Sequence, residues 1–264
     1  MNSKEIVTQI VRWLINYSNN SKTSGYVVGV SGGIDSALTS TLCAMTGLPT
    51  LCIDMPISQN KNEQKRGLDH IKWLKIKHNN VKSVTIDLSK TFESFKNSVE
   101  KKCDKNLLAL ANSRSRLRMG TLYYFSTINN YLVVGTGNKV EDFGIGFYTK
   151  YGDGGVDISP IADLYKTEIF EISSHLGINN DILNAKPTDG LWDDGRTDED
   201  QIGATYKELE WAMKQKDNGK ISTDFKNRQK EVFLILEKFN NANLHKINPI
   251  PIFLVSEKLR QNSI

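Results

Sequence analysis

The sequence predicts an α/β fold in which helices cover both faces of a parallel, doubly wound sheet. Short apolar runs rich in β-branched residues alternate with longer amphipathic stretches, as in chains built from strand–helix–strand units. A glycine-rich segment directly follows the first apolar run, which is typical of anion-binding turns at strand ends. The chain has 264 residues and 39% hydrophobic residues, so we expect residues 1–264 to form a single domain.

The first half of the chain supplies the predicted sheet. Residues 3–18 carry apolar side chains at helical spacing and predict an amphipathic helix. Four short apolar runs follow, which favour buried strands, and longer helical stretches separate them. We expect strands at residues 26–30, 50–54, 81–87 and 131–136, and helices at residues 37–45, 62–77, 88–103 and 106–129.

The second half of the chain has a different character. Residues 144–160 are rich in Gly and Asp without a clear period, which indicates irregular backbone. Helices are predicted over residues 163–176, 200–213 and 223–239, where apolar residues recur at helical spacing. Residues 184–200 combine Pro, Gly and several Asp residues, and long loops of this kind in compact domains are often binding loops or lids.

The composition argues against nucleic-acid and membrane partners. The formal net charge is +4 without a run of five or six like charges, whereas nucleic-acid-binding domains usually carry a basic stripe. Charged residues interrupt the apolar residues near the N-terminus, so neither a signal-peptide core nor a membrane span is expected. The three cysteines form no CxxC pair, and this usage favours a reducing, cytoplasmic location.

The strongest local signal is SGGIDS, at residues 31–36, between the first predicted strand and the next helix. Its two glycines allow close approach of the backbone to an anion, and N–H groups at the start of the helix would face that anion. Asp35 would repel a phosphate unless Mg²⁺ bridges the two groups, so Asp35 is a predicted metal ligand. The alternative is a plain strand-to-helix turn with a polar cap.

The segment SGGIDS resembles the pyrophosphatase loop of the adenine-nucleotide α-hydrolase superfamily, whose members cleave ATP between its α and β phosphates. The loop alone does not choose among NAD synthetase, GMP synthetase, asparagine synthetase, argininosuccinate synthetase and the tRNA-modifying members. The resemblance implies that ATP is a co-substrate and that its contacts include Gly29, Val30, Ser31, Gly32, Gly33, Ile34, Asp35 and Ser36.

Further segments resemble the ammonia-dependent NAD synthetase family specifically. They are NSRSRLRM at 112–119, GTGNKVE at 135–141, TKYGDGGVD at 149–157, PIADLYK at 160–166, KPT at 186–188 and HK at 245–246. TKYGDGGVD matches the family signature fully, whereas GTGNKVE departs from the more familiar GTDHAAE and one extra residue separates Glu141 from Lys150. The resemblance, from about residue 5 to 253, implies ATP-dependent amidation of deamido-NAD by ammonia through an acyl-adenylate, giving NAD, AMP and pyrophosphate.

The resemblance also implies roles for single residues. Asp35 and Glu141 would hold Mg²⁺, and Thr136, Lys166 and Thr188 would contact ATP. The implied contacts to deamido-NAD are Arg116, Lys150, Asp157, His245 and Lys246. An arginine suits both the pyrophosphate and the free carboxylate of this substrate because its forked donors match such groups.

Asp153 is the predicted catalytic residue. Ammonium has no free lone pair for attack, and a carboxylate near the reacting carbonyl could bind it and take its proton. The alternative is a turn residue that bonds its own backbone. The chain is too short for an added glutaminase domain of roughly 250 residues, so ammonia is the expected donor, and the resemblance implies a homodimer.

Three other functions remain as alternatives. A tRNA-modifying enzyme would need a basic platform or cysteine pairs, and a GMP synthetase would normally carry an added dimerisation domain. A sensor that binds ATP without turnover belongs to a different class, and the presence of both Asp35 and Glu141 argues against it.

Overall fold

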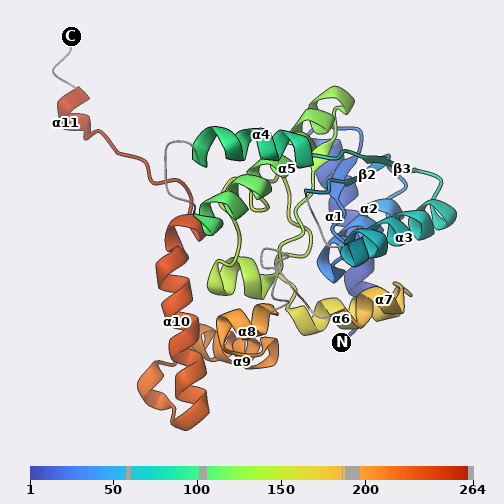
Figure 1. Ribbon diagram of the computed structural model, residues 1–264. Coiled ribbons are helices and arrows are strands. Elements are labelled where there is room, and N and C mark those ends of the chain that lie inside the picture. Colours follow the sequence, from blue (N-terminus) through green and yellow to red (C-terminus); the bar gives the residue numbers. More distant parts are fainter. Residues whose placement is uncertain (58–60, 101–105, 186, 188–196, 261–264) are drawn as a thin grey trace.

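The computed structural model describes residues 1–57, 61–100, 106–185, 187 and 197–260. A parallel sheet lies at its centre (Figure 1). Among the described residues this sheet has four strands in the order β3–β2–β1–β4. The strands are β1 (Tyr26–Gly29), β2 (Thr50–Asp54), β3 (Val81–Thr85) and β4 (Leu132–Val133). All four predicted strands are therefore confirmed, although β1, β3 and β4 are shorter than expected.

The strand order places the predicted loops together. Strand β1 pairs with β2 through Tyr26 and Thr50, and with β4 through Tyr26 and Leu132. The chain moves outward from β1 through β2 to β3 and then returns to the other side of β1. The strand order therefore reverses between β1 and β4, and ligands in open parallel sheets bind at such a reversal, beyond the carboxyl ends of the strands.

Helices cover both faces of the sheet, as predicted. Tyr26 and Val28 pack into a core shared with α1, α2 and α6, whereas Val27 packs toward α5 on the opposite face. This alternation follows from the two-residue period of a strand. The first face carries α1 (Ser3–Asn20), α2 (Ile34–Met45), α3 (Lys61–Lys77) and α6 (Lys166–His175), and the second carries α4 (Ser89–Glu100) and α5 (Leu107–Asn129).

A second core lies beside the sheet, where helices of the C-terminal part pack on the segment after β4 (Figure 1). Ile145, Leu209 and Phe233 are fully buried there. The elements of this core are the π-helix η1 (Lys139–Ile145), α8 (Asp198–Ile202), α9 (Tyr206–Asp217), the 3₁₀ turn η2 (Ser222–Asp224) and α10 (Asn227–Ile247). Helix α7 (Asn180–Leu183) packs instead into the first core with α2 and α6, and α11 (Glu257–Arg260) has no buried residue.

The single helix predicted over residues 200–213 is wrong. Gly203 adopts a positive φ of 84° and ends α8, and the side chain of Thr205 then caps α9 by accepting a hydrogen bond from Glu208 N. A left-handed glycine followed by a capping threonine stops one helix and starts the next. The helix predicted over 223–239 begins four residues later and continues to Ile247. In the part of the chain described here, no helix is long and apolar enough to span a bilayer.

Candidate active site

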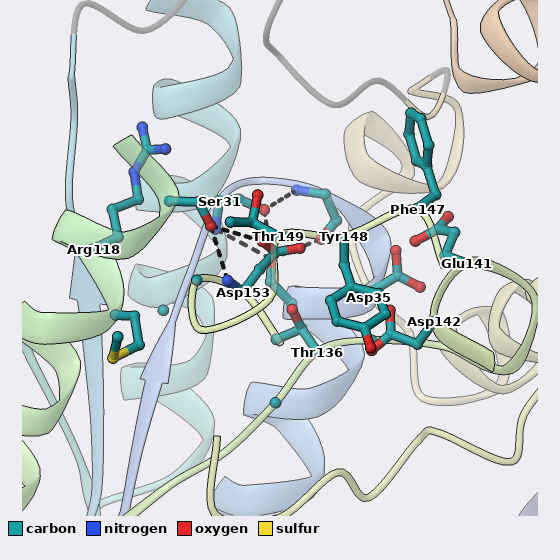
Figure 2. A pocket seen from close by; sticks show the side chains of 18 of the residues that line it. Ser31, Asp35, Arg118, Thr136, Glu141, Asp142, Phe147, Tyr148, Thr149 and Asp153 are labelled. Carbon is teal, nitrogen blue, oxygen red and sulfur yellow. Dashed lines mark hydrogen bonds between the residues drawn. The ribbon is translucent and has the colours of Figure 1, made fainter. Parts of the chain in front are cut away.

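A cavity of about 710 Å³ lies beyond the carboxyl ends of β1 and β4 (Figure 2). Its walls come from the loop after β1, the loop after β4, helix α5, the segment 146–156 and the first residue of α6. It therefore lies where the strand order predicts a ligand site. The predicted ATP contacts that line it are Gly29, Val30, Ser31, Gly33, Ile34, Asp35, Ser36, Thr136 and Lys166. Thr188 lies outside the described residues.

The two serines of the loop after β1 form hydrogen bonds within the loop. Ser36 Oγ accepts a hydrogen bond from Ser31 N at 3.2 Å, and Ser31 Oγ accepts one from Gly33 N at 3.2 Å. Gly32 has a φ of +88°, and a Cβ at this position would collide with the carbonyl oxygen of Glu63 on α3. Glycine is needed here both for the left-handed backbone and for the close approach of α3. Gly32 supports the loop from behind, since its own atoms do not line the cavity.

Two predicted metal ligands converge on one cation. Lys166 Nζ lies 2.7 Å from Asp35 Oδ2 and 2.8 Å from Glu141 Oε1. The lysine side chain is 3% exposed, and the two carboxylates are 18% and 17% exposed. Asp35 comes from the first turn of α2, Glu141 from η1 and Lys166 from the first position of α6. The three elements thus bring charges from distant parts of the sequence into one buried ion-pair network.

Burial and pairing set the pKa values of this network. Burial, together with the charge of Glu141, raises the pKa of Asp35 above its usual range despite the opposing effect of Lys166. Burial alone would also raise the pKa of Glu141, but the charge and hydrogen bond of Lys166 outweigh it and lower that pKa. Burial alone would lower the pKa of Lys166, but the two carboxylates outweigh it and raise that pKa. The lysine therefore stays protonated at neutral pH.

Two residues that support Glu141 were not found by the sequence analysis. Tyr206, from α9, donates a hydrogen bond of 2.6 Å from its hydroxyl to Glu141 Oε1. Asn138 is fully buried, donates to Asp35 at 3.3 Å and accepts from the backbone N–H of Glu141 at 3.0 Å. Asn138 could have been found, because it falls within GTGNKVE as the cap of η1. Tyr206 lies 65 residues beyond Glu141 and carries no local signal.

The turn after β4 contains Glu141 and is wider than an α-helical turn. Residues 139–145 form a π-helix, in which hydrogen bonds span one residue more than in an α-helix. From this turn the Glu141 carboxylate reaches Lys166, which also pairs with Asp35. Such π-turns occur frequently at functional sites.

The donor set fits a magnesium ion completed by substrate. Carboxylate oxygens of Asp35 and Glu141 already converge on a single positive group. Mg²⁺ is typically held by one or two carboxylates together with substrate phosphates. Across the described ranges, no cluster of three or more His, Cys, Asp or Glu residues could hold a metal alone. The residues therefore suit a metal that arrives with a phosphate ligand.

The predicted catalytic residue lies on the same cavity. Asp153 Oδ1 accepts hydrogen bonds from Ser115 Oγ at 2.7 Å and from Thr149 N at 3.0 Å, while Asp153 N donates to Ser115 Oγ at 2.8 Å. The alternative of a turn residue bonded to its own backbone is therefore partly realised through Thr149. The contact with Ser115 on α5 goes beyond a local turn.

Asp142 and Arg118 also line the cavity and were not among the predicted contacts. In Figure 2, Asp142 points into the same space as Asp35 and Glu141. Burial and the neighbouring carboxylates raise the pKa of Asp142 well above its usual range. Arg118, on α5, donates from Nε to the carbonyl oxygen of Met55 at 3.0 Å. Both signs of charge therefore line this cavity.

The predicted deamido-NAD contacts divide into two groups. Lys246 lines the cavity and donates to the carbonyl oxygens of two residues, 146 and 148, at 2.9 Å. Arg116 Nε donates to the carbonyl oxygen of Lys150 at 3.2 Å, and Lys150 Nζ donates to the carbonyl oxygen of His245. These three residues do not line the cavity but form one connected chain of contacts beside it.

Asp157 also lies outside the cavity lining. Its carboxylate accepts hydrogen bonds from the Tyr123 hydroxyl at 2.9 Å and from Val133 N at 2.8 Å. It thereby fastens the end of TKYGDGGVD to β4 and α5.

The sequence pattern of the NAD synthase family matches residues 6–249. The NH(3)-dependent NAD(+) synthetase of Carboxydothermus hydrogenoformans is 39% identical over 216 residues, which cover 80% of this chain and 85% of that protein. That of Methanosarcina acetivorans is 37% identical over 226 residues, covering 83% of this chain and 84% of the relative. Among solved structures, the NMN synthetase of Francisella tularensis superposes with a TM-score of 0.83 at 32% identity, covering 96% of this chain and 98% of that one. The NH3-dependent NAD synthetase of Campylobacter jejuni superposes with a TM-score of 0.77 at 25% identity, covering 96% and 100%.

Proposed function

The chain belongs to the NAD synthase family, and we infer that it is an ammonia-dependent NAD synthetase, a ligase that makes an amide from deamido-NAD, ammonia and ATP. One observation carries this inference: Asp35, Glu141 and Lys166 meet beside the phosphate loop, in the cavity that Asp153 also lines. A phosphate-binding loop, a pair of metal-binding carboxylates and a carboxylate for ammonium are the parts that this reaction needs.

The phosphate loop binds ATP in the first half of the reaction. Backbone N–H groups at the start of α2 and the hydroxyls of Ser31 and Ser36 face the phosphates, and Lys166 adds positive charge. The substrate carboxylate attacks the α-phosphorus of ATP, the bond to pyrophosphate breaks, and an acyl-adenylate forms. Asp35 and Glu141 would hold Mg²⁺, which when bound offsets the charge of the phosphates.

The second half of the reaction forms the amide. Asp153 binds ammonium from the cavity and accepts one of its protons. The nitrogen then attacks the activated carbonyl carbon, the carbon–oxygen bond to AMP breaks, and AMP leaves with the electron pair. A second proton from nitrogen passes to solvent. Ammonia is the donor that the names of the curated relatives support.

The dinucleotide would lie beyond the ATP site, toward the chain of contacts described above. We propose that Arg116, Lys150, His245 and Lys246 bind it, because guanidinium and ammonium groups suit its pyrophosphate and carboxylate. Asp157 belongs to the same proposal, since a carboxylate that accepts two hydrogen bonds keeps further acceptor sites. Thr136 and Thr188 are proposed ATP contacts.

A second candidate substrate is nicotinic acid mononucleotide. The observation that favours it is the Francisella tularensis neighbour named an NMN synthetase, whose TM-score of 0.83 exceeds the 0.77 of the Campylobacter jejuni NAD synthetase. The chemistry of the reacting carboxylate is the same in both substrates. The two candidates differ only in whether the substrate carries the adenylate half.

A homodimer, a cytoplasmic location and a single domain over residues 1–264 complete the proposal. Large apolar side chains on α5 support the dimer, because Tyr124 is 63% and Ile128 is 60% exposed, next to a shallow apolar groove. Light scattering of the purified chain measures the oligomeric state directly, and a monomer at micromolar concentration would contradict it.

A product assay tests the function. Purified protein receives ATP, Mg²⁺ and either deamido-NAD or nicotinic acid mononucleotide, with ammonium in one set of tubes and glutamine in another. Formation of NAD with ammonium alone, with one AMP for each NAD, is the expected result. Preferential formation of NMN would identify the mononucleotide, in place of the dinucleotide, as the substrate. Folded protein that binds ATP and makes neither amide would overturn the inference.

A further inference from the structure

Helix α5 holds the signature segment TKYGDGGVD through two side chains on one face. Asn112 Oδ1 accepts a hydrogen bond of 2.7 Å from the hydroxyl of Thr149. Ser115, three residues further along the helix, exchanges two hydrogen bonds with Asp153. Residues at this spacing lie on the same side of a helix. The segment is therefore anchored at both ends of its turn by the helix beneath it.

The contact between Ser115 and Asp153 is reciprocal. The serine hydroxyl donates to Asp153 Oδ1 at 2.7 Å and accepts from Asp153 N at 2.8 Å. The backbone N–H of Thr149 donates to the same carboxylate oxygen at 3.0 Å. Both hydrogen bonds to the carboxylate thus end on Oδ1, and no described residue donates to Oδ2. The protein therefore holds one oxygen of the Asp153 carboxylate, and the other oxygen stays able to accept further hydrogen bonds.

The packing of the turn depends on this contact. A Cβ on Gly152 would collide with Ser115 Oγ, so the serine side chain fills the space beside the glycine. The glycine allows the serine to reach Asp153, and the serine in turn fixes which way the carboxylate faces. A rotation of the Asp153 side chain would break the hydrogen bond to Ser115.

We propose that Ser115 is a positioning residue that orients the Asp153 carboxylate to receive ammonium, a role that rests on the proposed function. Ammonium is small and has no further groups that a site could bind. The orientation of one carboxylate therefore has a large effect on the affinity for ammonium. Fixing that direction beforehand favours binding, because the cost of ordering the carboxylate is met during folding. Ser115 acts through Asp153 and touches no reacting atom.

Steady-state kinetics of the full chain test the proposal. For Ser115→Ala, at saturating ATP and carboxylate substrate, we expect the KM for ammonium to rise roughly tenfold, the effect of one lost hydrogen bond to a charged group. The KM for ATP should not change. Ser113→Ala is the matched control, because the Ser113 hydroxyl bonds only the carbonyl oxygen of Ala109 in its own helix at 2.9 Å. Ser115→Cys, whose side chain is somewhat larger but keeps a weak donor, should fall between wild type and Ser115→Ala.

A double-mutant cycle with Asp153→Asn shows whether the serine acts through the aspartate. Addition of Ser115→Ala to Asp153→Asn should then change the KM for ammonium less than twofold. Independent, multiplying effects would overturn the proposal, as would an equal rise in the KM for ATP, which indicates general disorder of the loop. Wild-type protein that makes no amide would overturn the proposed function as well. Active wild type with an unchanged KM in Ser115→Ala would overturn this inference alone.

Discussion

Replacement of Lys166 by methionine tests the ion-pair network most directly. Lys166→Met keeps the apolar stem but removes the ammonium that lies 2.7 Å from Asp35 and 2.8 Å from Glu141. Two carboxylates then face each other without the cation between them. Removing one partner of a buried ion pair is strongly destabilising, because the remaining charge stays buried and uncompensated.

The size of the effect follows from the exposure of the three side chains. The lysine is 3% exposed, but the carboxylates are 18% and 17% exposed, so water screens part of their repulsion. We therefore expect the lower end of the range for broken buried pairs, about 3 kcal/mol of unfolding free energy. In a chain of this length each kcal/mol lowers the midpoint of thermal unfolding by about 2–4 °C, so the midpoint of Lys166→Met should fall by about 6–12 °C.

Thermal unfolding followed by circular dichroism, with and without a chelator, measures this effect. In EDTA the full loss should appear. In millimolar Mg²⁺ the variant should recover part of it, because a metal ion bound between the carboxylates stabilises the folded state. Lys139→Met is the control, because Lys139 pairs with a largely exposed carboxylate and should cost less than about 1 kcal/mol. A midpoint for Lys166→Met within about 2 °C of wild type in EDTA would refute the reasoning.

Three further predictions concern the proposed phosphate loop, the proposed metal ligands and the core. Gly32→Ala should weaken ATP binding, measured by calorimetry, at least tenfold, because the added Cβ meets a carbonyl oxygen. Gly47→Ala is the control, since Gly47 also has a positive φ but has open space around it, and this variant should bind ATP normally. Equal affinities of the two variants for ATP would contradict this. Tyr206→Phe removes a 2.6 Å hydrogen bond to Glu141 and should lower both stability, by about 1.5–3 kcal/mol, and Mn²⁺ affinity measured by electron paramagnetic resonance. Unchanged values would show that the tyrosine does not support the metal ligand. Burial lowers the pKa of His70 to about 4, so the folded state stays neutral while the unfolded chain, with a pKa of about 6.5, takes up a proton. Stability should therefore fall as the pH drops from about 6.5 toward 4, and His70→Asn should flatten this part of the pH profile; an unchanged slope would exclude the histidine as its source.

Local sequence patterns were sufficient for the sheet and for the place of the site. Runs such as Tyr26–Gly29 and the central residues 51–53 of β2 are apolar because strands of a parallel sheet are buried on both faces. The glycines and serines of SGGIDS carry their own backbone requirements, and Gly32 meets them with its positive φ. Strand ends in a parallel sheet meet at one edge, so the position of the cavity followed from the order of the elements.

Helix boundaries in the C-terminal half depended on packing that the pattern did not show. The apolar period continues from α8 into α9, which predicted one helix, but Gly203 and the cap at Thr205 divide it. The break allows α9 to turn and bury Tyr206 and Leu209 in the second core. The gain from that burial outweighs the local tendency to continue one helix.

The sequence by itself determined the fold class, the phosphate loop and the identity of Asp35, Glu141 and Asp153 as candidates. Only the tertiary structure decided how they are held. Lys166 is 131 residues from Asp35 and 25 from Glu141, and Ser115 is 38 residues from Asp153. The strength of an ion pair or a hydrogen bond depends on the distance between atoms in space, and that distance is set by the packing of helices on the sheet. A pattern of neighbouring residues in the sequence does not specify this distance.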